Sequence, residues 1–540
     1  MFEKCNPNRV KGFLRAEGTK VVNGDGEEVV MLGWGVGNWL LQEGYMWLSW
    51  HDSFDRPRRI EDTIKTLTGS EYADKFWKTF RDRYITKADI QNMYDLGYNS
   101  VRIPFNWRVL MKEEPGYQWC EEGFALIDRC LDWCEEVGIY AILDLHGAPG
   151  SQSGWNTDDS VGNLPRLLMD EDYWDKGIEL WREIARRYKD RWIVGSYDLL
   201  NEPVRPNLCS ELSRNKYISL LSRFYEECVM AIREIDQVHM LQLEGGHFST
   251  DNAIFFKRYD DNMLIHFHRY AVMPGMDAFD PYLKVSQELD QPLWVGETGE
   301  NKIEWFNALT ALSLSLDIGV NLWPWKKMVK QNDNSPCDIK QPEGWDEIIT
   351  FIDGGKKPSY ERAQQIFDEY LDNILIENCV HHTKIHDGIF KKPTFTIRAT
   401  DFDQFPGQGQ SFSGTANAGN EYRYRMDTKM RIEAVCEETE KEFWFDCGWD
   451  QLGLVLETGE FADYTVCSKD DDFKVSITLE CQQPAKLKLI WTNGETAEIS
   501  LDASVATIDT VPVTFNKDTG CLRVVVEEGK VRLHRLSFAK

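Results

Sequence analysis

Short apolar runs alternate with amphipathic stretches through the first 325 residues of the chain. Eight of the runs are β-type, and several stay apolar until they end in polar residues, as is typical of strands buried on both faces. Helical patterns lie between them, for example at residues 123–137 and 175–188. Strands separated by helices predict a parallel sheet, and eight such units in about 300 residues predict a (β/α)₈ barrel. The eight runs are residues 29–39, 99–105, 140–146, 194–202, 239–245, 263–270, 293–298 and 319–326.

Two segments near the N-terminus stand outside this alternation. Residues 13–30 carry Asn23-Gly24-Asp25-Gly26 at their centre, which predicts a β-hairpin around a tight turn. We expect this hairpin across the bottom of the barrel. Residues 39–80 form a long insertion rich in aromatic side chains, most of which we expect to serve packing. The insertion is expected at the rim of a site.

The pattern changes after residue 392. From there to the end of the chain, short β-type runs separated by turn residues predict an all-β sandwich of roughly 140 residues. We therefore expect a barrel domain with its N-terminal hairpin at 1–380, a linker at 381–392 and the sandwich at 393–540. His382 and His386 have a spacing that suits a metal site on a helix, but the Gly and Lys residues around them favour a linker. No metal is expected.

Composition narrows the range of partners. The 540-residue chain has 61 basic and 89 acidic residues, and its net charge of −28 argues against nucleic acid or an anionic membrane as partner. Neutral ligands fit this charge, and 20 Trp offer flat surfaces of the kind that stack on sugar rings. The 13 scattered cysteines, the polar start of the chain and the lack of a long apolar run predict a cytoplasmic protein without a membrane span. If a leader was removed, the protein would instead be secreted.

Chemically active residues end most of the predicted strands. Because the C-terminal strand ends of a (β/α)₈ barrel form its active site, we expect these side chains to meet at one mouth. Glu202 and Glu297 end the fourth and seventh runs and would face each other there, as a glycosidase with two carboxylates requires. The candidate residues are Arg102, His146, Asn201, Glu202, His268, Tyr270, Glu297, Trp323 and Trp325.

Several of these residues stand in motifs of a known family. Leu200-Asn201-Glu202-Pro203 is similar to the Asn-Glu-Pro motif of clan A glycoside hydrolases. Val295-Gly296-Glu297-Thr298-Gly299 is similar to the nucleophile motif on strand seven of that clan. Together with Val101-Arg102-Ile103-Pro104-Phe105, His146, His268-x-Tyr270 and the late Trp cluster, they make the chain resemble glycoside hydrolase family 5 over roughly residues 29–330.

This resemblance implies a retaining mechanism with two catalytic carboxyl groups. Glu202 would be the acid/base and Glu297 the nucleophile, with their carboxyl groups about 5 Å apart. Arg102 and Tyr270 would donate hydrogen bonds that keep Glu297 ionised. For Arg102, a purely structural ion pair is the alternative.

The resemblance also implies a set of substrate-binding residues. Asn201 would bond the 2-hydroxyl of the sugar, and His146 and His268 would line the −1 subsite. Trp325, together with Trp323, would form the floor of this subsite by stacking on the sugar. The alternative for these His and Trp side chains is packing in the barrel without a ligand, and for Trp323 packing is the more common role.

The C-terminal segment resembles carbohydrate-binding sandwiches of family 6. The resemblance rests on Asp446-Cys447-Gly448-Trp449, on residues 458–466 and on the closing Val531-x-Leu533-x₃-Ser537-Phe538. It implies that Trp449 stacks on a sugar. Thr400 replaces the glutamate of an early motif of the family, which puts its calcium site in doubt. The alternative is a sandwich that only buttresses the barrel.

These observations favour a retaining β-glycosidase that acts on a carbohydrate without a cofactor. We expect exo action on β-glucosides, because the insertion after the first strand would close a cleft into a pocket. An endo-β-glucanase or mannanase acting on polysaccharide is the alternative within the family. A non-catalytic carbohydrate-binding protein and a transglycosylase are the alternatives outside it. The sequence leaves the sugar, the linkage and the oligomeric state open.

Overall fold

The protein is described here by a computed structural model of the full chain. The described residues are 2–206, 213–329, 334–403, 412–413, 425, 428, 430–434, 451–468, 472–509, 513–514 and 519–540. They form two compact units. The first comprises Met1–Arg269, Pro281–Glu300 and Asp317–His381, and the second Tyr270–Asp280, Asn301–Leu316 and His382–Lys540.

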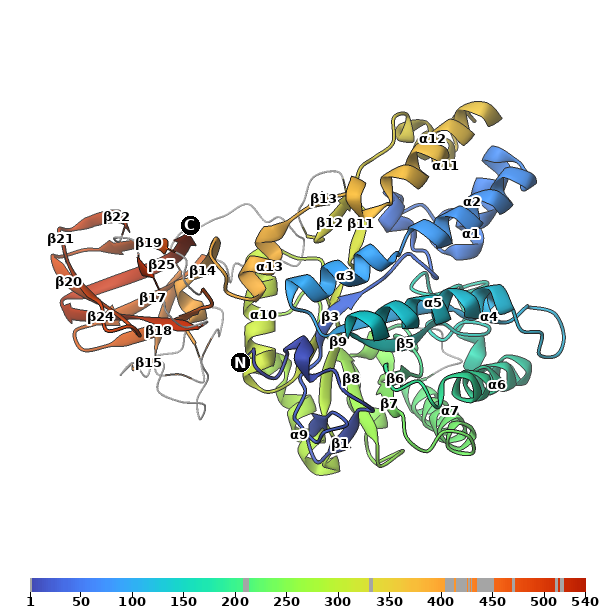
Figure 1. Ribbon diagram of the computed structural model, residues 1–540, viewed down its shortest axis with the longest axis horizontal. Helices are drawn as coiled ribbons and strands as arrows, with labels where there is room; N and C mark the ends of the chain where they lie inside the picture. The colour runs from blue at the N-terminus through green and yellow to red at the C-terminus, as the bar shows by residue number, and fades with distance from the viewer. Residues whose placement is uncertain are drawn as a thin grey trace. The chain divides into compact units, whose positions relative to one another are not determined.

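A closed barrel of eight parallel strands is the centre of the first unit (Figure 1), so the prediction of a (β/α)₈ barrel is confirmed. Its strands follow chain order around the barrel, and β10 closes it by pairing with both β9 and β3. The strands are β3 (Leu32–Gly35), β4 (Ser100–Asn106), β5 (Tyr140–Gly147), β6 (Val194–Asp198), β7 (Met240–Glu244), β8 (Met263–His268), β9 (Leu293–Gly299) and β10 (Gly319–Trp323). Every residue of these strands is buried, which explains their continuously apolar sequences.

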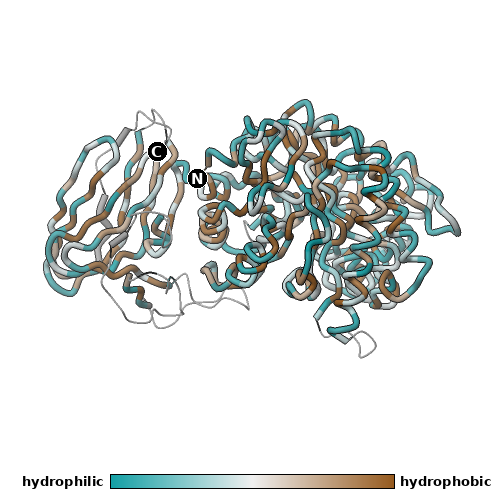
Figure 2. The backbone as a smooth tube through the Cα atoms, turned by 90° about the horizontal axis from the view of Figure 1, so that it is seen from below, coloured by the Kyte–Doolittle hydropathy of each residue, from teal (hydrophilic) through white to brown (hydrophobic). Residues whose placement is uncertain are grey.

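Amphipathic helices connect the strands, and α6 (Glu171–Tyr188) shows why they form. Asp170 caps its N-terminus by accepting from the Asp172 N–H, and basic side chains occupy its last turn. The other helices are α1 (Pro57–Thr68), α2 (Ser70–Arg83), α3 (Lys87–Leu96), α4 (Trp107–Leu110), α5 (Glu121–Val137), α7 (Arg214–Arg233), α8 (Gly246–Ser249), α9 (Asp280–Leu289), α11 (Trp345–Ile352) and α12 (Tyr360–Asn373). Figure 2 shows hydrophobic segments gathered inside this unit and hydrophilic ones along its outer turns.

The N-terminal hairpin turns at a different place from the one predicted. β1 (Arg15–Glu17) and β2 (Lys20–Val22) pair antiparallel, so the ladder reverses at Gly18 and Thr19. The Asn23–Glu27 stretch forms a second turn, closed by a bridge between Val22 and Glu28. The hairpin lies at the N-terminal strand ends, as expected, because the Ala16 N–H donates to Asn262, the residue before β8.

The aromatic insertion at 39–80 packs mainly into the first unit. The Trp47 ring lies 4.6 Å from the Tyr370 ring and 5.5 Å from the Phe80 ring, and its indole N–H donates to Asn38. Trp39 is equally buried and donates to the Arg81 carbonyl at 2.8 Å. The insertion therefore anchors α1, α2 and α12 against the barrel, as the packing interpretation of its tryptophans predicted.

The second unit contains two antiparallel sheets, so the expectation of an all-β C-terminal region is confirmed. In one sheet the order is β16-β17-β25-β19-β22, with β14 paired to β25 and β23 to β19. In the other the order is β15-β18-β24-β20-β21. The strands are β14 (Phe395–Arg398), β15 (Phe412–Ser413), β16 (Arg431–Ala434), β17 (Leu452–Glu457), β18 (Phe461–Val466), β19 (Asp472–Cys481), β20 (Ala485–Trp491), β21 (Thr496–Leu501), β22 (Ser504–Asp509), β23 (Val513–Thr514), β24 (Gly520–Glu528) and β25 (Lys530–Ala539).

The two sheets pack face to face through alternating side chains. Burial alternates residue by residue along β19, β20 and β24, as expected when one face of each sheet is covered. Phe473 of β19 meets Trp491 of β20 across the interface, with ring centroids 6.0 Å apart. The inner faces of the sheets thus form a common core.

Helices also belong to the second unit. They are α10 (Ile303–Ser315) and α13 (Thr383–Ile389), and α13 falls within the segment 381–392 that was predicted as a linker. Ile385 and Ile389 stand one helical turn apart on α13 and are both buried. Burial of this apolar pair explains why the segment is folded.

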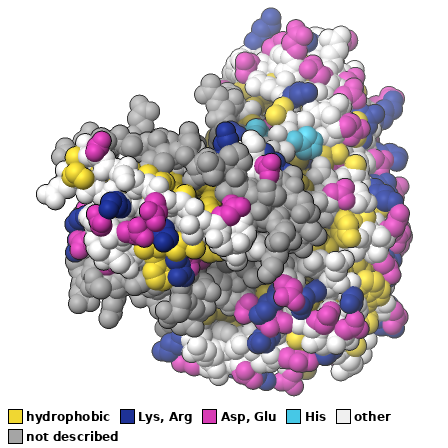
Figure 3. Space-filling view, turned by 60° about the vertical axis from the view of Figure 1, so that its left-hand side comes forward, with side chains coloured by type: hydrophobic (Ala, Val, Ile, Leu, Met, Phe, Trp, Pro, Cys, Tyr) yellow, Lys and Arg dark blue, Asp and Glu magenta, His cyan; other side chains and the backbone are white. Residues whose placement is uncertain are grey.

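No helix among the described residues is long and apolar enough to cross a membrane. On the face drawn in Figure 3, acidic and basic side chains lie next to one another.

Three short strands complete the first unit: β11 (Lys326–Met328), β12 (Cys337–Ile339) and β13 (Val380–His381).

Candidate active site

Seven barrel strands bring a set of functional side chains together, most of them at the C-terminal ends of the strands. Arg102 lies on β4, His146 on β5, Glu244 at the end of β7, His268 at the end of β8 and Glu297 on β9. Asn201 and Glu202 follow β6, and Trp323 ends β10. Parallel strands in a barrel point the same way, so these residues share one mouth.

Arg102 is the centre of this cluster. Its guanidinium is completely buried and donates from Nη1 to Glu297 Oε2 at 2.6 Å and from Nε to Asp198 Oδ2 at 2.9 Å. Nη2 reaches Asn201 Oδ1 at 2.9 Å and Glu244 Oε1 at 3.1 Å. Burial by itself lowers the pKa of Arg102, but attraction to the surrounding carboxylates outweighs it and raises the pKa well above its usual value.

A chain of hydrogen bonds orients the Asn201 amide. Its Oδ1 accepts from Arg102, so its Nδ2 is the atom that faces His146 Nε2, at 3.1 Å. The other nitrogen of His146, Nδ1, lies 2.7 Å from Asp144 Oδ2. Burial lowers the pKa of His146 to about 4, so the ring is neutral and accepts from Asn201. The Asn201 amide is thus held by Arg102 through its oxygen and by His146 through its nitrogen.

Glu202 forms hydrogen bonds with residues of two strands, β7 and β8. Its Oε1 accepts from His268 Nδ1 at 2.9 Å, and its backbone N–H donates to Glu244 Oε2 at 2.8 Å. Burial by itself lowers the pKa of His268, but the Glu244 and Glu297 carboxylates raise it well above the usual value. His268 is therefore a charged donor to Glu202.

Glu297 lies close to Glu202. One carboxylate oxygen of each lies within 4.8 Å of the other, with a nitrogen of His268 within the same distance of both. Burial raises the pKa of Glu297, and the charges of His268 and Arg102 act in the opposite direction. Retaining glycosidases hold their two carboxyl groups about 5–5.5 Å apart, whereas inverting ones leave about 6.5–9.5 Å for a water molecule. The spacing here suits direct attack by one carboxylate.

Aromatic and acidic residues of the insertion form one wall of the site. The Trp323 ring stacks on the His146 ring at 5.3 Å with an angle of 4° between the planes. Its indole N–H donates to the Tyr45 hydroxyl at 2.9 Å. Glu43 is buried nearby, and burial together with the charge of Glu297 raises its pKa well above the usual value. The rim prediction for the insertion therefore applies to its residues 43–45.

The structure corrects one predicted site residue and leaves two as predictions. Trp325 is completely buried, donates to Asp89 Oδ1 at 3.0 Å and packs against Trp34, so it has no face on which a sugar could stack. Trp323 is the tryptophan at the mouth. Tyr270 is half-buried two residues after β8, and its bond to Glu297 stays a prediction. Trp449 lies outside the described residues.

Three buried residues of the cluster were missed by sequence reasoning. Asp198 and His266 face each other, with 3.2 Å between Asp198 Oδ1 and His266 Nδ1, and Glu244 contacts both Arg102 and Glu202. The signals were present: Glu244 ends the fifth predicted strand, and His266 stands two residues before His268 on the same strand face. Asp144 was expected to support the barrel interior.

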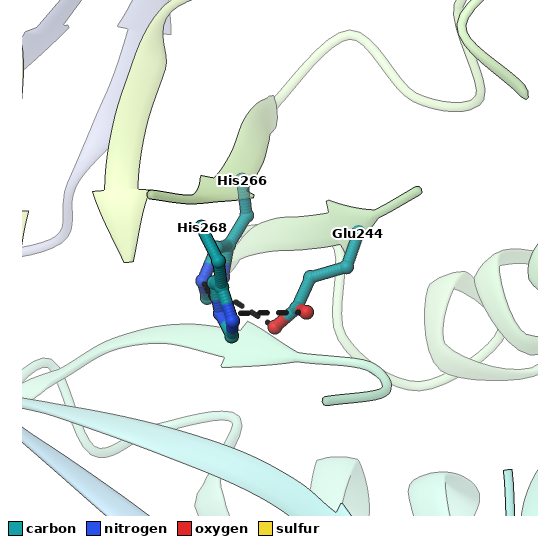
Figure 4. Close-up of side chains that lie close together, drawn as sticks. All are labelled: Glu244, His266 and His268. Carbon is teal, nitrogen blue, oxygen red and sulfur yellow. Dashed lines mark hydrogen bonds and ion pairs between the residues drawn. The ribbon is translucent and has the colours of Figure 1, made fainter. Parts of the chain in front are cut away.

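Among the described residues, two groups of side chains have ligand atoms close enough for a metal ion. They are Glu244, His266 and His268 (Figure 4), and Glu202, His268 and Glu297. However, the guanidinium of Arg102 lies 3.1 Å from a Glu244 oxygen and 2.6 Å from a Glu297 oxygen. A dication would be repelled by this cation and by charged His268. The cluster is better suited to proton transfer than to metal binding.

Comparison with known proteins agrees with this geometry. Residues 61–327 match the family described as Cellulase (glycosyl hydrolase family 5). A beta-xylosidase of Phanerodontia chrysosporium is 33% identical over 300 residues, which are 55% of this chain and 59% of the relative. Endoglucanase C of Acetivibrio thermocellus is 30% identical over 197 residues, 36% of this chain and 53% of the relative. A probable glucan 1,3-beta-glucosidase A of Aspergillus fumigatus is 29% identical over 268 residues, 48% and 59% respectively.

A closed (β/α)₈ barrel with two facing carboxylates at its C-terminal mouth is the arrangement that retaining glycosidases on this fold use. Residues 61–327, just under half of the chain, are similar to glycoside hydrolase family 5. The chain spans between half and three fifths of the length of these curated relatives.

The charge balance around Arg102 generates a first prediction. Arg102→Met should lower the free energy of unfolding at pH 8 by roughly 3–5 kcal/mol, because it leaves buried carboxylates without their cation. Without the guanidinium, burial raises the folded-state pKa values of Asp144 and Glu297 further above the unfolded ones. The folded variant then binds more protons than its unfolded chain, so the deficit shrinks as the pH falls from 8 to 5.

Thermal unfolding of both proteins across this pH range checks the prediction. Arg187→Met is the control, since Arg187 pairs with Glu121 and Glu183 near the surface and should cost less than about 1 kcal/mol. A deficit that is the same at pH 5 and pH 8 would contradict the account.

Proposed function

We propose that the protein is a retaining β-glycosidase that hydrolyses β-glucosidic bonds by double displacement and releases single sugars from small glycosides. The observation that carries the proposal is the pair Glu202 and Glu297, whose carboxylate oxygens approach within 4.8 Å at the mouth of the barrel. The similarity to family 5 and the glycosidase names of the relatives support the reaction class.

In the first displacement, Glu297 attacks the anomeric carbon as Glu202 protonates the departing oxygen. The bond from Arg102 Nη1 to Oε2 aligns the Glu297 carboxylate for this attack. The second N–H of the Asn201 amide supports binding of the 2-hydroxyl, an interaction that strengthens in the transition state.

In the second displacement, Glu202 removes a proton from water as the water oxygen attacks the anomeric carbon and Glu297 leaves. A charged donor next to Glu202 favours the carboxylate form that this step needs, and His268 is that donor. Neutral His146 stacked on Trp323 supports a −1 subsite with a flat, uncharged wall.

The exo mode is supported by the residues that narrow the mouth. The bond between Tyr45 and Trp323 ties the insertion to the end of β10, which supports the proposal that the insertion closes one side of the barrel mouth. Burial and the charge of Glu297 raise the pKa of Glu43 well above its usual value, which supports a hydrogen-bonding role for this carboxyl group toward sugar hydroxyls. A wall of this kind favours one terminal sugar over an internal one.

A second aromatic pair supports a place for the leaving group. Trp155 is 42% exposed and stacks on Phe248 at 5.6 Å and 19°. The Val204 carbonyl, two residues after Glu202, accepts from the His247 N–H at 2.7 Å, so this pair is tied to the acid/base segment. The departing group leaves on the acid/base side, where these rings offer a stacking surface.

Azide trapping tests the two carboxyl roles. Glu297→Ala should lose at least about 10⁴-fold in turnover. Glu202→Ala should lose at least about 10²-fold. With a dinitrophenyl β-glucoside, azide should restore Glu297→Ala and give the α-glycosyl azide, because it enters from the vacated nucleophile side. It should restore Glu202→Ala and give the β-glycosyl azide, because it attacks the glycosyl-enzyme.

The products are identified by NMR, with Glu121→Ala on the surface as the control. The same anomer from both variants, or no rescue of Glu297→Ala although the wild-type protein is active, would contradict the assignment.

Product chromatography tests the exo proposal. From β-linked gluco-oligosaccharides of three to six units we expect glucose and the chain shortened by one unit as the early products, together with fast hydrolysis of an aryl β-glucoside. Mixed oligosaccharides with inert aryl monoglycosides would instead establish an endo-acting enzyme with an open cleft.

We further propose that the C-terminal region binds carbohydrate. The support is its resemblance to family 6 sandwiches and its two facing antiparallel sheets. Soluble β-glucan in a native gel should retard the wild-type protein, and Trp449→Ala should weaken the retardation roughly five- to tenfold without change in aryl glycosidase activity. Phe256→Ala, an exposed aromatic residue of the first unit, is the control. Equal retardation of wild type and Trp449→Ala would favour a buttressing role.

A further inference from the structure

The Glu244 carboxylate takes no part in the double displacement, yet it contacts the groups that do. It is completely buried at the end of β7. Its Oε2 accepts from the Glu202 backbone N–H at 2.8 Å, and its Oε1 lies 3.1 Å from Arg102 Nη2. Glu244 therefore touches both the acid/base segment and the central cation.

Two histidines lie beside the same carboxylate (Figure 4), and one of them, His268, also contacts the acid/base side chain. His266 Nε2 lies 3.3 Å from Glu244 Oε1, and His268 Nε2 lies 3.5 Å from Glu244 Oε2. The Nε2 atoms of the two rings are 3.0 Å apart. The other nitrogen of His268, Nδ1, donates to Glu202 Oε1, so a single imidazole separates the two carboxylates.

The neighbouring strand leaves room for this arrangement. A Cβ atom on Gly296 of β9 would lie 1.8 Å from His266 Nε2. Only glycine at this position allows the His266 ring to stand beside Glu244. The residue directly before the nucleophile Glu297 is thus fitted to the histidine pair.

We infer that Glu244 is a positioning residue that governs proton binding by the Glu202–His268 pair and holds the Glu202 backbone in place. The inference rests on the proposed function, in which Glu202 is the acid/base. On this account, Glu244 is a fixed negative charge next to the Glu202–His268 pair, and the pair acts in both displacements.

The negative charge of Glu244 acts on Glu202 through His268. Charged groups from the neighbouring strands surround this histidine. A negative charge favours proton binding at each neighbouring group, whichever of the two holds the proton. Removing the Glu244 charge therefore weakens proton binding at both members of the pair, Glu202 and His268. The titratable and charged groups that face His268 are Glu244 on β7, Glu297 on β9, Glu202 after β6, His266 on β8, Arg102 on β4 and the adjacent Arg269.

The proton balance of the reaction fits this role. When Glu202 gives its proton to the departing oxygen, the carboxylate left behind faces the Nδ1–H of His268 at 2.9 Å. When Glu202 takes a proton from water, it returns to its starting state, and His268 keeps its own proton throughout. Glu244 stabilises charged His268 during the interval in which Glu202 is ionised.

Glu244 also stabilises an unusual backbone conformation. Glu202 has φ of 44°, in the left-handed region that non-glycine residues rarely adopt. Its N–H is fixed by the bond to Glu244 Oε2. Glutamine at position 244 keeps an acceptor for this N–H and removes the charge, whereas alanine removes both.

The test compares pH profiles of kcat/KM on an aryl β-glucoside with a poor leaving group. Glu244→Gln should move the alkaline limb of the profile to lower pH by about one unit or more, because loss of the negative charge weakens proton binding by the Glu202–His268 pair. A shift of one pKa unit needs only a modest change in local potential. Glu244→Ala should show the same shift and an additional fall in kcat, because the Glu202 N–H loses its acceptor. Asp236→Asn is the matched control, since Asp236 pairs with His239 at 2.6 Å ahead of β7, outside the cluster, and should leave the limb in place.

An NMR titration keeps the inference testable if a variant is inactive or unfolded. With ¹⁵N-histidine labelling, the imidazole of His268 in the wild-type protein should stay protonated above pH 8, and in Glu244→Gln it should titrate at lower pH. An unshifted alkaline limb in folded Glu244→Gln, or a wild-type His268 that titrates near pH 6.5, overturns the inference. A wild-type protein inert on every glycoside overturns the proposed function instead, and the NMR result still decides the coupling.

Discussion

A single buried cation organises the mouth of this barrel. Arg102 contacts carboxylates from β5, β6, β7 and β9, and burying these acids together without it would be strongly unfavourable. Its planar guanidinium presents donors in several fixed directions, which a lysine does not. The positions of Asn201 and Glu297 relative to each other follow from this geometry, because both accept from the same group.

Hydrogen bonds that begin at Arg102 determine the donor and acceptor roles of the side chains around it. Asn201 is oriented by Arg102, and its amide then determines which nitrogen of His146 must accept. His146 in turn stacks on Trp323, which bonds to Tyr45 of the insertion. The site therefore depends on a continuous path from the barrel interior to its rim, and no member can change its donor or acceptor role independently.

The barrel and most of this cluster could be predicted from the sequence, because parallel strands alternate visibly with helices and end in chemically distinctive residues. The sequence favoured Trp325 over Trp323 as the stacking residue, and the burial of Trp325 contradicts this, since the direction of a side chain beyond a strand end depends on its packing partners. Trp325 turns toward Asp89 and Trp34, and neither contact has a local signal. Glu244 and His266 were overlooked because their importance comes from neighbours far away in the chain, Arg102 above all.

Backbone strain is concentrated in the same place as the charge. Glu202, Val204, His247 and Phe248 all have positive φ, and backbone bonds join their two segments. Such conformations persist only where surrounding contacts determine them, and here those contacts are the Glu244 carboxylate and the Val204 carbonyl. Glu202, the proposed acid/base, thus sits on a segment held by polar contacts to β7 and α8, whereas Glu297, the proposed nucleophile, sits inside a strand. Loop changes near Phe248 can therefore alter the leaving-group side while the Arg102 cluster and Glu297 stay in place.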